Sequence, residues 1–576
     1  MPQNSTSTEI QPVLSAAQRI AARLKHHGVE VLFGQSLPSA LILACEDVGI
    51  RQFVYRTENA GGAMADGFAR ISGRIGIVTA QNGPAATLLV PPLAEALKAS
   101  VPILALVQDV NRDQVDRNAF QDFDHHALFA PCAKFVRSVP DPSRVEEYVD
   151  AAIVAATSGR PGPAVLLLPA DMLIAEAPEP RFQRTAKFGH WPLERTAPSQ
   201  HTIEAAAQLV AGARNPVIIA GGGVHASGAY DELAALQDLG IPVAYTMMGK
   251  GSVSDRHPMT MGLVGNAMGI NSSGRHIRPL LDEADVIILV GTRTNQNGTD
   301  SWTLLPPEAK IIHIDVDPTE IGRTYEATVR VVADARTSLE ALISNLRLQS
   351  PGELPNLDTN RTERIASAFQ AREAELADLM TNEGPLRPEQ VMLCCKEYIN
   401  ENSIVAADAS YSSIWITSFL DAQRPGQRFL APRGLAGLGW GLPLAIGAKV
   451  SSPRSRVLCV VGDGGFGHCW AELETLKRMG CPLTLIVLNN AILGFQKHAE
   501  IVKFGRFTSA IDFADVDHAA IARACGMPSH RVGTLDELRN ALSESFDDNY
   551  RAHLIEVVCD SDAIPPLTMF ETLAQK

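Results

Sequence analysis

The sequence lacks several features that would place it in a specialised class of protein. Its 9 cysteines include no Cys-x-x-Cys pair, so we expect neither a disulfide framework nor a zinc site. Its apolar stretches, such as 101–107 and 483–488, are much shorter than the roughly 18 residues that cross a bilayer, so no membrane span is predicted. The net charge is -14 and the sequence contains no long basic tract. These two features argue against nucleic acid or an anionic membrane surface as a partner.

The remaining composition is that of an ordinary globular protein. Apolar residues make up 46% of the 576 residues and charged residues 20%, which is enough for several domains with large cores. The first 12 residues are polar and show no basic region followed by an apolar block, the pattern of a secretory signal. We therefore expect a cytoplasmic protein with reduced cysteines that acts on a small molecule.

Short apolar runs ending in Gly, Asp, Asn or Pro recur between stretches of helical periodicity. Such continuous apolar strands, alternating with helices, are typical of a parallel sheet covered on both faces. The expected strands are 29–34, 75–80, 101–109, 164–169, 216–220, 285–291, 310–315, 404–408, 456–462, 482–490 and 553–558. Proline-rich, polar segments at 175–200 and 349–360 are predicted to be linkers that pack no core. The fold class is therefore α/β, with three doubly wound parallel-sheet domains over 1–185, 200–348 and 380–576.

A glycine-rich turn and a pair of asparagines carry the strongest chemical signal. Gly-Asp-Gly at 462–464 ends one expected strand and Asn-Asn at 489–490 ends the next, with 24 residues between them. The carboxyl ends of parallel strands are where open sheets bind ligands. Asp463 and Asn490 would offer the hard oxygen ligands that Mg²⁺ takes together with phosphate oxygens. The bare glycine N–H groups would let a diphosphate approach at a helix amino end.

This spacing resembles that of thiamine diphosphate-dependent enzymes. The resemblance implies that Asp463, Asn490 and the backbone carbonyl of Ile492 bind Mg²⁺, and that the third domain holds the diphosphate. It also implies that Glu58, which follows an expected strand at 52–55, hydrogen-bonds the cofactor's pyrimidine ring from the first domain. Related enzymes often have His before this Glu, whereas Thr57 stands here.

Other segments of the chain match the cofactor-binding parts of the family. The glycine-rich stretch 434–443 places Leu438 as the apolar wedge under the folded cofactor. A Ser-Tyr-Ser-Ser segment at 410–413 stands where acetolactate synthases carry Gly-Gln-His-Gln. The cofactor-binding residues implied by the resemblance are Glu58, Asn82, Tyr411, Ser412, Gly437, Leu438, Asp463, Gly464, Gly465, Asn490, Ile492 and Leu493.

The resemblance is closest to the acetolactate (acetohydroxyacid) synthase-like group. Residues 81–87 resemble its Ser-Gly-Pro-Gly-Ala-Thr turn, and Ala-Phe-Gln-Asp at 119–122 resembles Ala-Phe-Gln-Glu, with Lys134 falling 13 residues after the Gln. The segment 493–500 should face the substrate but is more polar than in the synthases. By this match the catalytic residues are Glu58, Phe120, Gln121, Gln35 and Gln496. His125 and His126 are expected at the surface or behind the site.

The central domain departs from the group. Acetolactate synthases carry Arg-Phe-Asp-Asp-Arg after the strand that ends at 290–291, and this chain has Thr-Arg-Thr-Asn-Gln there, so we expect no FAD. A flavin-free central domain leaves open an alternative, a 2-hydroxyacyl-CoA lyase or oxalyl-CoA decarboxylase. CoA would then bind the central domain, with Lys250, Arg275 or Arg293 as phosphate partners.

The leading hypothesis is a thiamine diphosphate- and Mg²⁺-dependent lyase or transferase that makes or breaks a C–C bond next to a carbonyl. Its substrate would be a 2-oxo acid, a 2-hydroxy acid or an acyl-CoA derivative. In this family the pyrimidine and diphosphate sites come from different subunits, so a homodimer or homotetramer is expected.

Overall fold

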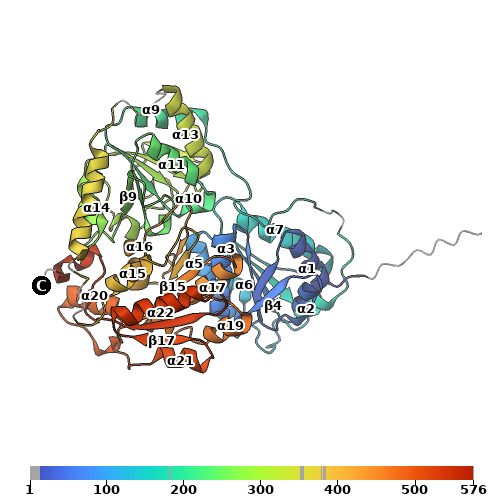
Figure 1. The fold of residues 1–576 in the computed structure, drawn as a ribbon. Coiled ribbons are helices and arrows are strands. Elements are labelled where there is room, and N and C mark those ends of the chain that lie inside the picture. The colour runs from blue at the N-terminus through green and yellow to red at the C-terminus, as the bar shows by residue number, and fades with distance from the viewer. Residues whose placement is uncertain are drawn as a thin grey trace, which may run out of the picture. The chain divides into compact units, whose positions relative to one another are not determined.

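The computed structural model describes residues 13–180, 182, 184–349, 354, 356–377, 379–380 and 384–574. These residues contain three six-stranded sheets, and the named strands within each sheet pair in parallel. Helices flank each sheet, which confirms the predicted α/β class with three doubly wound domains (Figure 1). None of the described helices is both long and apolar enough to span a bilayer.

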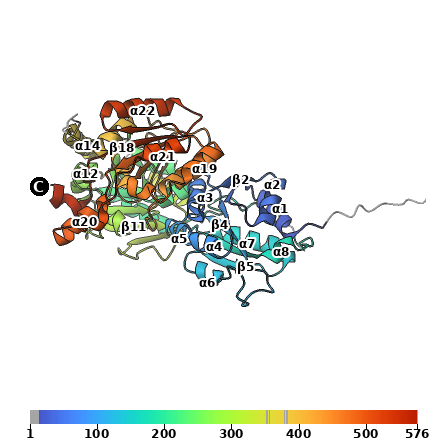
Figure 2. The ribbon, with the colours of Figure 1, turned by 90° about the horizontal axis from the view of Figure 1, so that it is seen from below.

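The chain divides into two compact units, Met1–Ala65 with Arg74–Leu193 and Asp66–Gly73 with Glu194–Lys576. The first sheet has the order β2-β1-β3-β4-β6-β5. Alternate residues of its strands pack against α1, α2, α7 and α8, which lie together in both views (Figures 1 and 2). The elements from the start of the described chain are α1 (Ala16–His26), β1 (Val31–Gly34), α2 (Ser39–Asp47), β2 (Arg51–Val54), α3 (Glu58–Ser72), β3 (Gly76–Ala80), α4 (Pro84–Leu88), α5 (Val90–Ala99), β4 (Ile103–Asp109), α6 (His125–Phe129), β5 (Phe135–Ser138), α7 (Val145–Thr157), β6 (Ala164–Pro169) and α8 (Ala170–Ile174).

The second sheet has the order β12-β11-β10-β7-β8-β9 and is covered on both faces. Ile218 and Ile288 point to a core shared with α9, α11 and α13, whereas Ile219 and Ile287 point to a core shared with α12 and α14. Continuous apolar strands are therefore needed here, because neither face meets water. The elements are α9 (Gln200–Ala211), β7 (Pro216–Ala220), α10 (Gly222–Ser227), α11 (Tyr230–Asp238), β8 (Val243–Tyr245), β9 (Thr260–Leu263), α12 (Ser273–Asp282), β10 (Val286–Val290), β11 (Lys310–Asp315), β12 (Val329–Val332), α13 (Ala335–Gln349) and α14 (Arg361–Ala377).

The third sheet has the order β14-β13-β15-β16-β18-β17, the same arrangement as the first. In both sheets the first strand in sequence lies between the second and third, so the connections leave it in opposite directions and open a crevice at the carboxyl ends. The elements are α15 (Pro388–Lys396), β13 (Ile404–Ala407), α16 (Tyr411–Phe419), β14 (Phe429–Leu430), α17 (Gly441–Ser451), β15 (Val457–Gly462), α18 (Asp463–Phe466), α19 (Glu472–Met479), β16 (Thr484–Asn489), α20 (Gly494–Phe504), α21 (His518–Ala524), β17 (Ser529–Val532), α22 (Leu535–Asp547), β18 (His553–Val558) and α23 (Glu571–Ala574).

Every strand expected from the sequence overlaps an observed strand, but β5, β8, β9, β12, β14 and β17 were not predicted. Five of these six lie at the edges of their sheets, and β8 lies beside one. Both predicted linkers contribute to a core. Ala177 of the segment 175–200 is buried in the core of the first sheet, and Leu354 and Leu357 of the segment 349–360 are buried in the central core. The prediction that these linkers pack no core is therefore wrong.

Gly221 lies where the loop after β7 meets the loop after β10. Its N–H donates to the Val290 carbonyl at 2.8 Å, and a Cβ at this position would overlap the Gly291 carbonyl oxygen. Gly221→Ala should therefore destabilise the central domain by about 1–3 kcal/mol, as overpacking does. In Gly212→Ala, in the same domain, the nearest atom lies at 3.4 Å, an ordinary contact. Thermal unfolding should show a lower melting temperature for Gly221→Ala alone; equal melting of both variants would contradict the packing argument.

Candidate active site

A cavity of about 530 Å³ lies in the second unit at the carboxyl ends of β13, β15 and β16. The crevice of the third sheet opens between β13 and β15, so the cavity is at the place where such sheets bind ligands. It brings together most of the residues predicted for this part of the chain. Those that line it are Tyr411, Ser412, Leu438, Asp463, Gly464, Gly465, Asn490, Ile492, Leu493 and Gln496.

Gly437 is not among the lining residues of this cavity. A Cβ at Gly437 would lie 2.5 Å from the Trp440 ring, so packing inside the loop explains this glycine. The structure therefore gives Gly437 a role in shaping the loop that carries Leu438.

Asp463 is the point where the two halves of the predicted motif meet. It begins α18 directly after β15 and is only 8% exposed. Burial raises the pKa of Asp463 to about 6, whereas hydrogen bonds from the backbone N–H groups of Gly464, Ala491 and Asn490 lower it. The glycine-rich turn and the asparagine turn thus converge on one carboxylate.

The two asparagines after β16 do different work. Asn489 is buried and its amide Nδ2 donates to Glu556 Oε1 at 2.7 Å, which ties the strand end to β18. Asn490 lines the cavity, and its Oδ1 accepts the Ile492 N–H at 3.3 Å. Ala491 between them and Ile492 has a φ of 55°, the left-handed turn that reverses the chain. Only the second asparagine therefore faces the space beside Asp463.

The lining fits a cation that carries a diphosphate. Gly462 has extended backbone angles (φ -84°, ψ 156°), and a Cβ there would meet only Ser412 Oγ at 3.8 Å. Neither backbone conformation nor packing demands glycine at this position, so the open space itself accounts for it. The buried Asp463 carboxylate with a raised pKa would be compensated by a hard cation, for which carboxylate, amide and carbonyl oxygens are suitable ligands.

Asp408 is a site residue that the sequence reasoning did not single out. It follows β13, is buried, and accepts the N–H groups of Gly439 (2.9 Å), Trp440 (3.1 Å) and Gly441 (3.2 Å). These bonds hold the glycine-rich loop and the start of α17 at the cavity. Burial raises the pKa of Asp408, and the bonds from these N–H groups oppose that shift. The available signal was an acidic residue at the end of an expected buried strand.

Tyr411 and His498 form a hydrogen-bonded pair in the cavity wall. The Tyr411 hydroxyl lies 2.7 Å from His498 Nδ1, and the two rings stack with centroids 5.9 Å apart. Burial lowers the pKa of His498 to about 4, with a further contribution from the Lys497 charge, and burial raises the pKa of Tyr411. Both rings are therefore neutral at pH 7. The Tyr411 hydroxyl also lies 3.2 Å from the Gly494 carbonyl oxygen, so it bridges the start of α20 and the imidazole. His498 is buried, so this side of α20 is not a solvated helix face.

The neighbours of His498 are oriented differently. Gln496 is exposed at the cavity mouth, and its amide donates to Glu500 Oε1 at 2.9 Å. Lys497 Nζ contacts Asp562 Oδ1 at 2.5 Å, which connects α20 to the C-terminal segment. The polar residues of this helix thus divide between the cavity and the C-terminal segment.

In the first unit, the predicted residues follow β1, β2 and β3 at the crevice of the first sheet. Glu58 is the first residue of α3, and burial raises its pKa. Gln35 donates to the Arg56 carbonyl at 3.1 Å, two residues before Glu58. The structure therefore brings Gln35 to the segment that leads into Glu58.

A second group in the same unit is joined by side-chain amides. Asn82 Nδ2 donates to the Gln121 carbonyl at 3.2 Å, and Gln81 Nε2 donates to Gln121 Oε1 at 2.8 Å. Phe120 is 86% exposed. Of the two histidines, His125 is buried behind this group and His126 is exposed.

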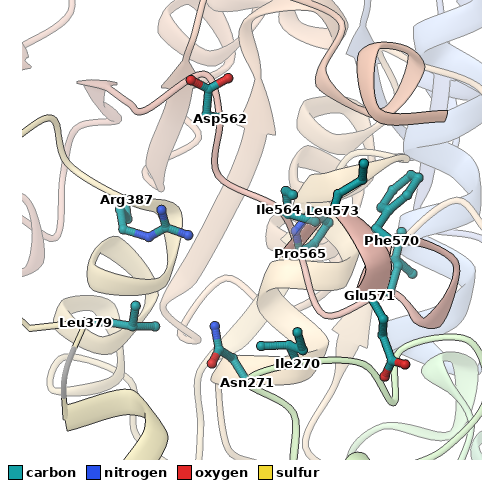
Figure 3. Close-up of a pocket in the computed structure, with 11 residues that line it drawn as sticks. Ile270, Asn271, Leu379, Arg387, Asp562, Ile564, Pro565, Phe570, Glu571 and Leu573 are labelled. Carbon is teal, nitrogen blue, oxygen red and sulfur yellow. The ribbon is translucent and has the colours of Figure 1, made fainter. Parts of the chain in front are cut away.

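Leu567 of the C-terminal segment lines both the main cavity and a second cavity of about 310 Å³. Figure 3 shows the second cavity. The Thr568 N–H donates to the Asn266 carbonyl and the Gly269 N–H to the Pro566 carbonyl, both at 3.0 Å. The segment is thus docked on the central domain. The residues that Figure 3 labels around the second cavity are Ile270, Asn271, Leu379, Arg387, Asp562, Ile564, Pro565, Phe570, Glu571 and Leu573.

The central domain offers less to a CoA phosphate than the sequence suggested. Lys250 is buried, with its ammonium 2.7 Å from Asp255 Oδ2 and 2.9 Å from the Tyr245 hydroxyl. The N–H groups of Gly221 and Gly223 donate to the carbonyls of Val290 and Gly291. Internal contacts therefore explain Lys250 and this glycine-rich turn.

The fold and the cavity together define an α/β enzyme with a cofactor site at the crevice of a parallel sheet. Models of thiamine pyrophosphate enzymes match a large part of each of the three α/β regions. These are the N-terminal TPP binding domain at residues 14–128, the central domain at 203–342 and the C-terminal TPP binding domain at 408–557. The chain belongs to the thiamine pyrophosphate enzyme family.

Comparison with curated relatives shows which group within this family the chain resembles. A probable acetolactate synthase large subunit of Methanocaldococcus jannaschii is 33% identical over 568 residues, which cover 96% of this chain and 93% of the relative. Acetolactate synthases of Arthrospira platensis (32% identical, 88% of each chain) and Mycobacterium leprae (30% identical, 96% of this chain and 88% of the relative) are also similar. The chain is a thiamine diphosphate-dependent enzyme of the acetolactate synthase-like group, as its motifs predict.

His498 should make folding sensitive to acid. Between pH 6.5 and about 4 the unfolded chain protonates this histidine while the folded chain keeps it neutral, so stability is lost as pH falls through that window. The loss reaches about 3 kcal/mol at its lower end. In cofactor-free protein, the melting temperature of His498→Gln should therefore decrease less between pH 7.5 and pH 5 than that of the wild type. The matched control is His201→Gln, at an exposed position; equal pH dependence in both variants would contradict the assignment.

Proposed function

We propose that this enzyme uses thiamine diphosphate and Mg²⁺ to decarboxylate a 2-oxo acid and join the remaining fragment to a carbonyl acceptor, as in acetolactate formation. The observation that carries the proposal is the buried Asp463 carboxylate, with Asn490 beside it, at the crevice of the third sheet. When bound, thiamine diphosphate supplies a carbon nucleophile and holds the electron pair left as CO₂ departs. The named relatives are acetolactate synthases, which supports this reaction class.

The residues of the second unit would bind the charged end of the cofactor. Asp463, Asn490 and the Ile492 carbonyl hold Mg²⁺, and the N–H groups of the glycine turn receive the diphosphate. Leu438 supports the cofactor from below. The residues that complete its surroundings are Tyr411, Ser412, Gly464, Gly465 and Leu493, and Gln496 faces the substrate from the cavity mouth.

The first domain would supply the proton-handling and substrate-facing groups. The raised pKa of Glu58 favours a carboxyl that keeps its proton, as donation to a pyrimidine ring nitrogen requires. Gln35, Asn82, Phe120 and Gln121 would contact the substrate and the reacting carbon. The three domains are proposed to span 1–185, 200–348 and 380–576.

We infer that the active enzyme is a cytoplasmic homodimer or homotetramer in which Glu58 comes from a second copy. It is proposed to work without FAD. The CoA-dependent alternative is not favoured, because the curated relatives are acetolactate synthases and Lys250 is held by Asp255 and Tyr245. The ultraviolet–visible spectrum of the purified protein would show whether flavin is bound.

Turnover of pyruvate tests the reaction directly. Protein supplied with thiamine diphosphate and Mg²⁺ should release CO₂ from pyruvate and form acetolactate, both of which are measurable by product assay. The proposal would be overturned by a protein that does not react with pyruvate, alone or with a second 2-oxo acid, but that cleaves a 2-hydroxyacyl-CoA or decarboxylates oxalyl-CoA.

Glu58→Gln should keep cofactor binding and lose turnover. An amide cannot exchange the proton that a carboxyl exchanges, and positioned acid–base groups contribute about 10²–10⁴-fold. We expect turnover to fall by about 100-fold or more, with thiamine diphosphate affinity within a few-fold of wild type by calorimetry. Glu46→Gln, on the exposed face of α2, is the control. Wild-type turnover in Glu58→Gln would remove this residue from the mechanism.

Asp463→Asn should abolish the dependence of cofactor affinity on Mg²⁺. Mutation of a residue that hydrogen-bonds a metal ligand typically lowers metal affinity by roughly 10–100-fold. Loss of the ligand itself should lower metal affinity by more than this. Titration of thiamine diphosphate with and without Mg²⁺ measures this. Asp536→Asn, exposed on α22, should bind as wild type does. Unchanged Mg²⁺ dependence in Asp463→Asn would place the metal elsewhere.

A further inference from the structure

His125 makes two hydrogen bonds that fix its protonation. It is only 1% exposed and lies at the start of α6 in the first unit. Its Nε2 is 2.9 Å from the Gly83 nitrogen and its Nδ1 is 3.1 Å from Asp109 Oδ1, at the end of β4. A backbone N–H can only donate, so Nε2 accepts and the ring proton lies on Nδ1, directed at Asp109.

Gly83 is the part of the turn after β3 that His125 holds. It has a φ of 65° and a ψ of -117°, a conformation that L side chains rarely adopt, and it precedes Pro84 at the start of α4. A Cβ at Gly83 would lie 2.8 Å from the Gln121 Cβ. Gln121 has a φ of 62°, and because Gly83 has no side chain the turn can lie directly against this left-handed residue of the loop.

The same turn holds the loop 110–124, which contains no helix or strand. Gln81 and Asn82, the two residues before Gly83, donate to Gln121 Oε1 (2.8 Å) and to the Gln121 carbonyl (3.2 Å). The beginning of the loop is tied separately, because Arg112 donates to Asp171 Oδ2 at 2.8 Å. The middle of the loop, from Asp113 to Gln121, therefore depends on the turn for its place.

We propose that His125 is a positioning residue that sets the place of Gln121 and Asn82 by holding the Gly83 N–H, with Asp109 fixing the tautomer. Removal of the acceptor leaves the buried Gly83 N–H unpaired, and the turn shifts to give this N–H another partner. Gln121 then leaves the place from which it contacts substrate. This last step rests on the proposed function, whereas the ordering of the loop does not.

Trypsin cleavage of cofactor-free protein tests the ordering. Arg117 is exposed in the middle of the loop, so cleavage after it reports how often the loop opens. His125→Phe keeps the ring but removes the acceptor, whereas His125→Gln offers an amide oxygen to the Gly83 N–H. The matched control is His126→Phe, at the exposed neighbouring position. Cleavage after Arg117 should be about tenfold faster in His125→Phe and near the wild-type rate in the other two.

The histidine tautomer in the wild-type protein provides a second measurement that needs no variant to fold. Imidazole nitrogen NMR of histidine-labelled protein, with the signal assigned by its loss in His125→Gln, should show a neutral ring protonated at Nδ1. A ring protonated at Nε2 would overturn the proposal. Wild-type cleavage in His125→Phe, or cleavage in His125→Gln as fast as in His125→Phe, would do the same.

Kinetics with pyruvate tests the consequence for turnover. We expect kcat in His125→Phe to fall by about 10- to 100-fold, the effect of a small misplacement near the reacting atoms, with thiamine diphosphate affinity unchanged. His125→Gln should recover most of the loss. Unchanged kcat in His125→Phe, with the loop opened, would overturn the catalytic consequence. If the wild-type enzyme is inactive on pyruvate, the proposed function is refuted instead. The rate of trypsin cleavage after Arg117 and the tautomer measured by NMR would then still decide whether His125 positions the loop.

Discussion

The site in the second unit depends on a buried carboxylate at the end of a parallel strand. Asp463 stands where β15 stops, and its charge is met only partly by the N–H groups of the turns around it, which is why burial raises its pKa to about 6. A carboxylate in such a place is costly unless another group compensates it. The turn glycines, the second asparagine and the open space beside them are all consistent with a bound cation as that group.

Asp408 solves the same physical problem in another way. It is more deeply buried than Asp463, and its oxygens accept three N–H groups from the end of the glycine-rich loop and the first residue of α17. A Cβ at Gly465 would overlap the Asp408 carboxylate, so the glycine turn and the glycine-rich loop are fitted to each other through this residue. Asp408 therefore holds the loops that surround the cavity, whereas Asp463 offers its carboxylate to the cavity.

The first and third sheets share one strand order but place different chemistry at the crevice. The third carries carboxylate and glycine N–H groups, which suit a cation and a diphosphate. The first carries the amides of Gln35, Asn82 and Gln121 together with the carboxyl of Glu58. Neutral donors and acceptors of this kind suit an uncharged ring and a polar substrate. The fold provides the position, and the residues after each strand decide what binds there.

The sequence predicted most of the central strands and missed most of the edge strands for a physical reason. β4 reads Ile-Leu-Ala-Leu-Val and is buried on both faces, so its apolar run is continuous. β12 and β17 are half-exposed edge strands with arginine or histidine in them, and β14 has two residues, so none shows such a run. The motif spacing likewise predicted that Asp463 and Asn490 meet, because adjacent parallel strands end together.

The side-chain pairs that form the wall of the main cavity could not be predicted from the sequence. Tyr411 and His498 are 87 residues apart, and no local pattern joins them. Burial of His498 depends on α20 packing against α16 and on the C-terminal segment, so it emerges only from tertiary structure. Asp408 was visible as an acid after a strand, but its partners lie more than 30 residues away.

Phe570 links the C-terminal segment to this wall. Its ring lies 5.7 Å from His498, 5.7 Å from Phe495 and 6.3 Å from Tyr411, centroid to centroid. The resulting aromatic cluster leaves a buried imidazole with little access to water, and a charged ring would need that water. The neutral state of His498 and the docking of the C-terminal segment therefore support each other. Because Leu567 of that segment also lines the main cavity, the shape of the cavity depends on the same packing.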